Sequence, residues 1–352
     1  MQRTVTFPAH SISSKVITME NESIVDIFYD AIFDIRKTYA LITDTNIARL
    51  YKKELSTLPK NFTLITIPAG ERSKNFSMIE KLSEKLLKIN VGKKDVLVGL
   101  GGGVVGDITG LLASLYMRGI PYIHIPTTLL AMCDSSIGGK NGVNTAGGKN
   151  LLGTIRQPLA TIIQPCFFAT LPEKEVRNGL AECIKCAVMM SKKLFTLIEK
   201  NHQAILKKDI PLLNTLIAQT RNLKTMIVTG DPDEKSLRKI LNYGHTIGHA
   251  LEKVSVYTIP HGAAIAIGMH LENVVGLNKK IVQKKVVDQV KELLEAVGFQ
   301  TKLPARTKKT ISHYLAHDKK REGTHIPMYL PSRVGSAKLH EIPIHDLQSV
   351  LL

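Results

Sequence analysis

Cysteine is scarce in this sequence, with four residues among 352, at positions 133, 166, 183 and 186. So few, so unevenly placed, cannot form a disulfide scaffold at this length, and a reducing cytoplasmic location is expected. The start of the sequence also lacks the apolar core and cleavage site of a signal peptide. Hydrophobic residues make up 44% and charged residues 22%, a composition that excludes a largely disordered chain.

Acidic residues are few beside basic ones: thirty Asp and Glu stand against forty-seven Lys and Arg, for a net charge of +17. The excess indicates an anionic partner, which can be nucleic acid, an acidic membrane surface or a phosphorylated metabolite. Long unbroken basic runs are missing, so a nucleic-acid-binding tail is not expected. The apolar stretch 96–116 has nearly the length of a membrane span, but its glycines instead predict a strand, a turn and a helix.

The first and second halves of the chain have different hydrophobic patterns. Short β-branched runs at 39–44, 62–68, 95–100 and 121–128 alternate with helical segments such as 77–89, which predicts a parallel sheet. After about residue 165, apolar residues recur at i, i+3 and i+4 over long helices, and a small hairpin is expected in the tail. The predicted fold is an α/β domain (1–165) with a Rossmann-like parallel sheet that binds a nucleotide, followed by a mainly α-helical domain (166–352).

A glycine-rich turn at 101–106, GGGVVG, has the spacing G-x-G-x-x-G between a predicted strand and a predicted helix. Glycines there let the backbone approach a pyrophosphate, and amide groups at the helix N-terminus would meet its charge. No acidic residue ends the next strand to bind ribose hydroxyls, so Asp44, at the end of an earlier strand, is the candidate. A tight structural turn is the alternative interpretation.

One polar stripe lies on the helix predicted over RKILNYGHTIGHALE; its members, at i, i+4, i+7 and i+11, are Arg238, Asn242, His245 and His249. Burying such groups without partners costs roughly several kcal/mol, so a ligand or metal is expected; an internally satisfied polar face is the alternative. His261 opens the next helix, and Glu182 is the one acid in the middle of another apolar helix. Two histidines and a carboxylate are typical of a catalytic metal site.

Two glycine-rich segments carry residues suited to a small anion: Asp134, Lys140, Asn144, Lys149 and Asn150. They are interpreted as loops, with solvated turns as the alternative. Neither has the G-x-x-x-x-G-K-[ST] pattern, so hydrolysis of a nucleoside triphosphate is not expected. Cys183 and Cys186 lie inside a predicted helix and are interpreted as small core residues.

Taken in order, these blocks resemble the 3-dehydroquinate synthase family of sugar-phosphate cyclases. The matching blocks are PAGERSK, GLGGGVVGD, RGIPYIHIPTTLLAMCDSSIGGKNGVN, GKN, TLPEKEVRNGLAECIK, RKILNYGHTIGHALE, HGAAIAIGMH and DKK. The resemblance implies a carbon–oxygen lyase of the shikimate pathway, which makes precursors of the aromatic amino acids. It would convert 3-deoxy-D-arabino-heptulosonate 7-phosphate to 3-dehydroquinate by oxidation at C5, phosphate elimination, re-reduction, ring opening and aldol cyclisation. It further implies bound NAD⁺, zinc or cobalt, and a cytoplasmic homodimer without nucleic-acid or membrane partners.

The resemblance also assigns site residues. The implied metal ligands are Glu182, His245 and His261. The implied NAD⁺ contacts are Asp44, Asn46, Gly70, Glu71, Lys74, Gly103, Val104, Val105, Gly106, Asp107, Thr127, Thr128, Lys140, Lys149, Phe167 and Thr170. The implied catalytic residues are Asp134, Lys140, Lys185, Arg238, Asn242 and His249. The implied substrate contacts are Arg118 from the neighbouring subunit, Asn150, Lys224, Arg238, Asn242, His249 and Lys320, for which Lys319 is an alternative.

Small departures from the family pattern occur at Asn141, Thr145, Ile155 and Arg156, none of which is a ligand position. Three other functions stay open. Related cyclases that make 2-deoxy-scyllo-inosose or valiolone-type products share the metal and NAD⁺ residues, but Arg238 with Lys224 suits the carboxylate of the heptulosonate. A metal-dependent polyol dehydrogenase would share the two-domain plan and release its reduced cofactor. A basic nucleic-acid-binding module would bind with strong salt dependence and need no metal.

Overall fold

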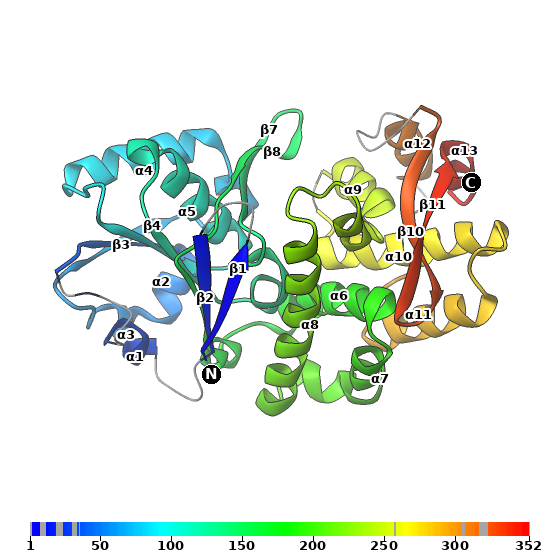
Figure 1. Ribbon diagram of the computed structural model, residues 1–352, viewed down its shortest axis with the longest axis horizontal. Helices are drawn as coiled ribbons and strands as arrows, with labels where there is room; N and C mark the ends of the chain where they lie inside the picture. Colours follow the sequence, from blue (N-terminus) through cyan, green and yellow to red (C-terminus); the bar gives the residue numbers. More distant parts are fainter. Residues whose placement is uncertain are drawn as a thin grey trace. The chain divides into compact units, whose positions relative to one another are not determined.

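The computed structural model describes residues 2–7, 12–18, 24–29, 34, 36–256, 258–304, 307–316 and 323–351. The chain divides into two compact units, Met1–Leu171 and Pro172–Leu352 (Figure 1). The sequence-based boundary lies after residue 165, a few residues earlier. Among the described helices, none combines the length and apolarity that a bilayer-spanning segment needs.

A seven-stranded sheet forms the centre of the first unit, in the order β1-β2-β9-β6-β5-β3-β4. Its neighbouring strands pair in parallel, except for the antiparallel edge pair β1–β2. The strands are β1 (Gln2–Phe7), β2 (Ile12–Thr18), β3 (Tyr39–Asp44), β4 (Phe62–Ile67), β5 (Val96–Gly101), β6 (Tyr122–Pro126) and β9 (Ala160–Ile163). The Rossmann-like parallel sheet predicted from the sequence is thereby confirmed.

Helices cover this sheet because its central strands are mostly apolar and buried. All six residues of β5 are buried, as expected for a strand with both faces covered. The helical segments are α1 (Ile24–Tyr29), α2 (Thr45–Leu50), α3 (Lys52–Leu55), η2 (Glu71–Ser73), α4 (Phe76–Lys88), α5 (Gly103–Leu115), η3 (Tyr116–Arg118), η4 (Ala131–Ser135) and η5 (Pro165–Ala169). Ile79, Leu82 and Leu86 of α4 join Ile108 and Leu112 of α5 in one core cluster.

Much of the two glycine-rich segments is strand and not loop, which corrects the sequence-based interpretation. They form an antiparallel hairpin of β7 (Lys140–Thr145) and β8 (Gly148–Ile155), which packs on α5. Asn141 explains the docking, because its Nδ2 donates to the carbonyl oxygens of Gly139 (2.8 Å) and Arg156 (3.0 Å). Its side chain also fills the space that a Cβ on Gly110 of α5 would occupy. Tertiary packing therefore imposes strand structure on a glycine-rich sequence.

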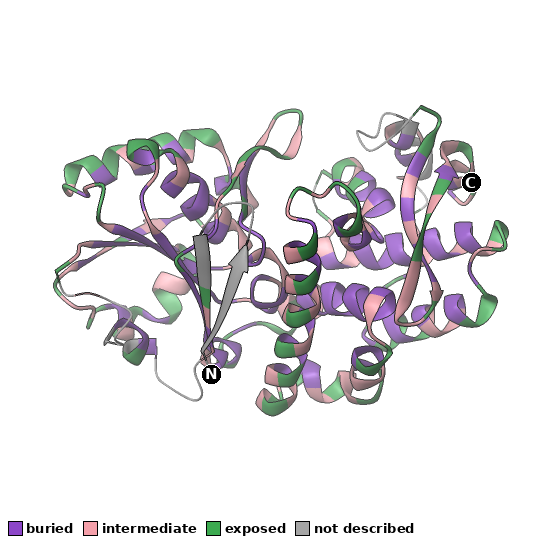
Figure 2. Cartoon of the chain, in the orientation of Figure 1, coloured by how far each residue is buried: buried purple, intermediate pink, exposed green. Residues whose placement is uncertain are grey.

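The second unit is mainly helical, as predicted, with one small hairpin of β10 (His325–Arg333) and β11 (Ser336–Pro343). Its helical segments are α6 (Glu173–Met190), α7 (Lys192–Leu206), α8 (Ile210–Gly230), η6 (Leu237–Asn242), α9 (His245–Val254), α10 (His261–Asn278), α11 (Lys284–Ala296), α12 (Lys308–Ala316) and α13 (Ile344–Ser349). Helices α6 and α10 are buried along most of their length and pack on each other (Figure 2). They form the centre of this unit.

The continuous helix predicted around 238–252 is wrong. A 3₁₀ helix, η6, ends at Asn242, and α9 starts at His245. Between them Gly244 adopts φ 78°, a left-handed conformation that glycine tolerates and that interrupts a helix. Arg238 and Asn242 therefore do not continue the face of α9 on which His245 and His249 lie.

A buried histidine lies beneath the start of α5. The ring of His124 in β6 is 5% exposed and occupies the space that a Cβ on Gly106 would need. Burial lowers the pKa of His124 to about 4, so its imidazole is neutral at pH 7. This folded-state pKa lies below the value near 6.5 expected for an unfolded chain.

The buried His124 should make the free energy of unfolding depend on pH. Between about pH 6.5 and pH 4 the unfolded chain binds a proton at His124 that the folded protein excludes, so stability falls as pH falls through this window. From pH 7 to pH 5 this histidine should account for about 2 kcal/mol of lost unfolding free energy, at about 1.36 kcal/mol per pKa unit. Urea unfolding at both pH values should show that loss shrink in His124→Gln and persist in His325→Gln, a change at an exposed histidine. An undiminished loss in His124→Gln would contradict the assignment.

Candidate active site

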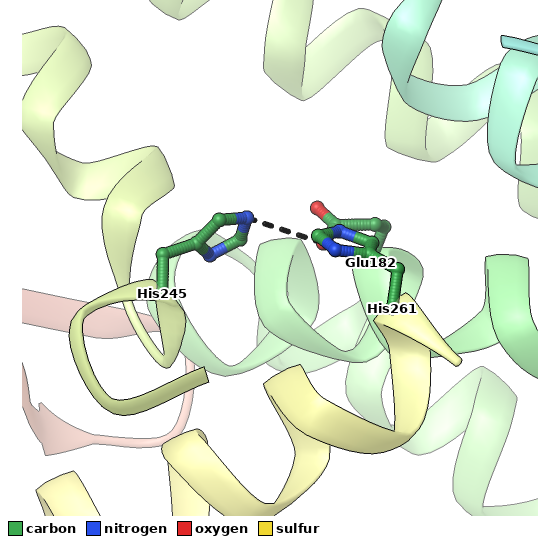
Figure 3. A group of neighbouring side chains, drawn as sticks. All are labelled: Glu182, His245 and His261. Atoms are coloured by element: carbon green, nitrogen blue, oxygen red, sulfur yellow. Dashed lines mark hydrogen bonds and ion pairs between the residues drawn. The ribbon is translucent and has the colours of Figure 1, made fainter. Parts of the chain in front are cut away.

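Three helices of the second unit bring an acid and two histidines together. Glu182 lies within α6, His245 is the first residue of α9, and His261 is the first residue of α10. One donor atom from each lies within 4.8 Å of the others, and the side chains point toward one another (Figure 3). The Nε2 atoms of His261 and His245 are 3.3 Å and 3.5 Å from Glu182 Oε1. The three residues singled out as ligand candidates therefore form one cluster.

The other ring nitrogen of each histidine already has an acceptor. His245 Nδ1 donates to the carbonyl oxygen of Tyr243 at 3.1 Å, and His261 Nδ1 donates to Glu252 Oε2 at 3.4 Å. A proton on each Nδ1 leaves the Nε2 lone pairs directed at the shared space beside Glu182. Two imidazole nitrogens and one carboxylate oxygen fit a divalent ion such as Zn²⁺ or Co²⁺.

Charged neighbours set the protonation of this cluster. Burial by itself raises the pKa of Glu182, but the adjacent Lys185 and His261 outweigh it and hold that pKa below its usual range. Lys185, one turn along α6, forms an ion pair with Glu182 Oε2. Burial lowers the pKa of His261, yet hydrogen bonds to Glu182 and Glu252 raise it to about 9. Without a cation, His261 thus carries a proton at neutral pH, and metal binding would release it.

His249 lies beside the cluster on the same face of α9 as His245. Their rings are 5.0 Å apart in a T-shaped arrangement, and His249 Nε2 is 3.9 Å from Glu252 Oε2. The His249 side chain is 52% exposed, whereas that of Glu252 is 2% exposed. His249 can therefore exchange protons with solvent while remaining next to the cluster of Glu182, His245 and His261.

Cationic side chains are buried in the same unit. Lys185 of α6, Lys224 of α8 and Arg238 of η6 are all less than a tenth exposed, and these three elements pack on one another. The backbone N–H of Arg238 donates to Asp231 Oδ2 (2.9 Å) and its guanidinium donates to the carbonyl oxygen of Pro232 (2.8 Å). The arrangement suits an anionic ligand, since cations buried in a protein bind carboxylate or phosphate strongly.

Several acids around these residues were missed in the sequence. Asp231 accepts the backbone N–H groups of Arg238, Ser236 and Lys235, which lower its pKa. Glu234 Oε1 accepts from Asn242 Nδ2 at 2.9 Å and so orients a predicted substrate contact. Glu252 could have been found from its spacing, because it follows His249 by three residues and His245 by seven on the same helix face.

The glycine turn in the first unit has the geometry of an anion site. Helix α5 starts at Gly103, and the preceding Gly102 has no side chain to cap it, so the first-turn amide groups have no side-chain cap. The backbone N–H of Thr127 donates to the carbonyl oxygen of Gly101 at 3.0 Å, and the Thr128 side chain lies over Gly102. The predicted NAD⁺ contacts of this turn therefore gather at the carboxyl ends of β5 and β6.

The PAGERSK segment is tied to this turn and to the hairpin. The buried Lys74 forms an ion pair with Asp107 of α5. Asn144 of β7 donates from Nδ2 to Glu71 Oε1 and from its backbone N–H to the Lys74 carbonyl oxygen, both at 2.8 Å. The backbone N–H of Asn150 in turn donates to Asn144 Oδ1 at 3.0 Å. The structure thus brings together four segments that the sequence separates.

Other predicted residues have clear structural roles in the first unit. Asp44 ends β3 beside β5 and caps α2, because its Oδ1 accepts the N–H groups of Asn46 (2.8 Å) and Ile47 (3.1 Å). The Thr170 hydroxyl contacts the Tyr51 hydroxyl at 2.7 Å. Phe167 packs edge-on against the Tyr51 ring.

The remaining predicted residues are spread over the first unit. Asp134 lies in η4, Lys140 opens β7, Lys149 lies in β8, and Arg118 ends η3. Gly70 precedes η2 with φ 102°. Lys319 and Lys320 lie outside the described residues.

Known proteins resemble this chain over nearly its whole length. The 2-epi-5-epi-valiolone synthase of Streptomyces hygroscopicus, solved with NAD⁺ and Zn²⁺, matches with a TM-score of 0.87 at 27% identity, over 97% of this chain and 96% of that one. A 2-deoxy-scyllo-inosose synthase, solved with carbaglucose-6-phosphate, NAD⁺ and Co²⁺, matches with a TM-score of 0.86 at 25% identity, over 100% and 99%.

Sequence comparison gives a more specific result. The 3-dehydroquinate synthase of Dictyoglomus turgidum is 43% identical over 302 residues, which cover 86% of this chain and 84% of that protein. The family model described as 3-dehydroquinate synthase N-terminal matches residues 64–178, and the one described as 3-dehydroquinate synthase C-terminal matches 179–321. The chain therefore belongs to the 3-dehydroquinate synthase family.

Proposed function

We propose that this chain converts 3-deoxy-D-arabino-heptulosonate 7-phosphate to 3-dehydroquinate and inorganic phosphate, as a carbon–oxygen lyase of aromatic biosynthesis. The observation that carries the proposal is the convergence of Glu182, His245 and His261, in a member of this family, with buried cations in the same unit. A metal-binding cluster alone would suit many reactions. The neighbouring Lys185, Lys224 and Arg238 add the means to hold a substrate with two anionic groups.

Two cofactors complete the site. Bound NAD⁺ supplies a hydride acceptor and donor for C5, and a divalent metal supplies Lewis acidity that lowers the pKa of the C5 hydroxyl. Glu182, His245 and His261 would hold the metal. The first turn of α5, the Lys74–Asp107 pair and the other NAD⁺ residues predicted from the sequence would hold the nucleotide, with pyrophosphate at the helix N-terminus.

His249 is the proposed proton carrier. Its imidazole lies beside His245 and reaches solvent, and histidine is the side-chain type that commonly gains and loses a proton near neutral pH. It would accept the proton of the C5 hydroxyl during oxidation and return it during re-reduction. Once C5 is a carbonyl, the proton at C6 becomes acidic, and phosphate leaves by β-elimination with the substrate phosphate itself as the base.

Arg238 determines the proposed choice of substrate. A guanidinium binds a carboxylate through two parallel hydrogen bonds, and Arg238 is buried next to the helix that carries Lys224. Among the sugar-phosphate cyclase substrates considered, the heptulosonate is the one with a carboxylate. Lys185 and Asn242 would orient its hydroxyl groups, and the other predicted contacts are Asp134, Lys140, Asn150 and Lys320.

A homodimer is the proposed assembly, with Arg118 reaching the phosphate in the neighbouring site. Arg118 and the preceding Met117 both have left-handed backbone conformations, with φ values of 59° and 48°. Apolar side chains beside this turn are strongly exposed: Leu115 at the end of α5, Met117 in η3, and Leu151, Leu152 and Ile155 on β8. A hydrogen bond of 2.8 Å between Thr154 and Ser114 joins these two segments, so the exposed area suits a second copy of the chain.

The activity itself has a direct test. Incubation of the heptulosonate phosphate with protein, zinc and catalytic NAD⁺ should release one phosphate per carbocyclic product without net NADH. Stoichiometric NADH would instead identify a polyol dehydrogenase. Salt-dependent binding of DNA or RNA without turnover would support the nucleic-acid-binding alternative.

Loss of one proposed metal ligand should abolish turnover. His261→Ala removes one of three donors, so zinc content after dialysis should fall to background and activity should fall by about 100-fold or more. His270→Ala changes a histidine on the same helix that is outside the cluster and should retain both zinc and activity. Full activity of the unmodified protein in metal-depleted buffer would count against the assignment.

Shared sites can be tested by mixing inactive variants. Arg118→Ala and His261→Ala should each be inactive, but in a mixed dimer one site would combine an intact metal cluster with an intact Arg118 from the other subunit. Random mixing should therefore restore about a quarter of the wild-type sites, because half the dimers are mixed and each has one intact site. Mixed dimers, verified by two affinity tags, that show no activity would reject sharing.

A further inference from the structure

Glu272 is a buried acid that the proposed reaction does not use. It lies within α10, has no solvent exposure, and is surrounded on its own helix by apolar residues such as Ile265, Met269 and Val275. Its carboxylate accepts three backbone N–H groups: Oε2 from Gly244 at 2.7 Å, and Oε1 from Thr246 at 3.2 Å and Ile247 at 3.4 Å. All three belong to the start of α9.

These hydrogen bonds replace an ordinary helix cap. The first N–H groups of a helix have no partner within it, and a Ser, Thr, Asp or Asn at the cap position usually accepts one of them. Here the cap position is Gly244, whose φ of 78° and contact with α10 leave no room for a side chain, since a Cβ would lie 2.6 Å from Met269 Cγ. A carboxylate from the neighbouring helix therefore supplies the acceptor, and its negative charge matches the positive end of the α9 dipole.

The contact fixes the backbone on both sides of a proposed metal ligand. His245 lies between Gly244 and Thr246, and Glu272 binds the N–H groups of both. Close packing also holds Gly244 in place, because a Cβ on Gly268 of α10 would overlap the Gly244 carbonyl oxygen. Tyr243, whose carbonyl oxygen accepts from His245 Nδ1, also donates from its hydroxyl to the Met269 carbonyl oxygen at 3.3 Å.

We propose that Glu272 is a positioning residue of the metal site: its carboxylate anchors the start of α9 and thereby sets the place of His245 opposite Glu182 and His261. The inference depends on the proposed metal-binding role of His245. Burying a carboxylate at this depth carries a large desolvation cost, which the three N–H donors and the helix dipole offset. Removing its charge should loosen the geometry of the cluster while leaving all three ligands in the chain.

Glu272→Gln is the informative variant because it keeps the size of the side chain and removes its charge and one acceptor. Competition with a chromophoric chelator should show Co²⁺ and Zn²⁺ binding weakened by about 10- to 100-fold, the range for partners of metal ligands. The visible absorption bands of the Co²⁺ protein should shift, since they report ligand geometry. Glu272→Asp keeps the charge on a shorter side chain and should fall between wild type and Glu272→Gln.

Asp209→Ala is the matched control, because Asp209 caps α8 by accepting the N–H of Leu212 at 3.0 Å and lies outside the metal cluster. It should lower the melting temperature without changing Co²⁺ affinity or absorption. If Glu272→Gln binds Co²⁺ with wild-type affinity and spectrum, the positioning role is wrong while the proposed function stands. If Glu272→Gln fails to fold, the Co²⁺ affinity and absorption spectrum of Glu272→Asp provide the test. Wild-type values for both would then reject the positioning role. A wild-type protein that binds neither metal would instead overturn the proposed function.

Discussion

Burial of the Glu182 carboxylate is the constraint on which the second unit depends. A charge with 1% exposure needs partners, and they come from three helices: Lys185 on α6, His245 at the start of α9 and His261 at the start of α10. Each partner must approach within hydrogen-bonding or ligand distance, so the helices cannot shift independently without leaving a charge unpaired. The same requirement that makes the site costly to fold keeps the carboxylate and the two imidazoles together.

The cluster is supported by a second layer of acids. Glu252 accepts from His261 Nδ1, and Glu272 accepts the N–H groups on either side of His245. Glu252 therefore acts on an imidazole ring, whereas Glu272 acts on the backbone on either side of His245. Because α9 and α10 carry the two histidines at their first residues, the place where each helix starts sets the position of its imidazole.

The sequence predicted much of this fold because local patterns were strong. The strand at 39–44 is β3, the helix at 77–89 differs from α4 by one residue at each end, and Glu182 stood out as a lone acid in an apolar helix. The continuous helix through Gly244 was wrong, because its break depends on Met269 and Glu272 of a later helix. The hairpin at 140–155 was missed for the same reason, since its docking depends on Gly110 of α5.

Four of the basic residues are buried inside the two units. Lys74, Lys185, Lys224 and Arg238 are each less than a tenth exposed, so they cannot form the surface that a long polyanion requires. Lys74 and Lys185 are bound to acids of their own unit, Asp107 and Glu182, which hold their side chains in place. Cations fixed in this way meet a small anion without losing further side-chain freedom, which favours a metabolite such as a sugar acid phosphate over nucleic acid.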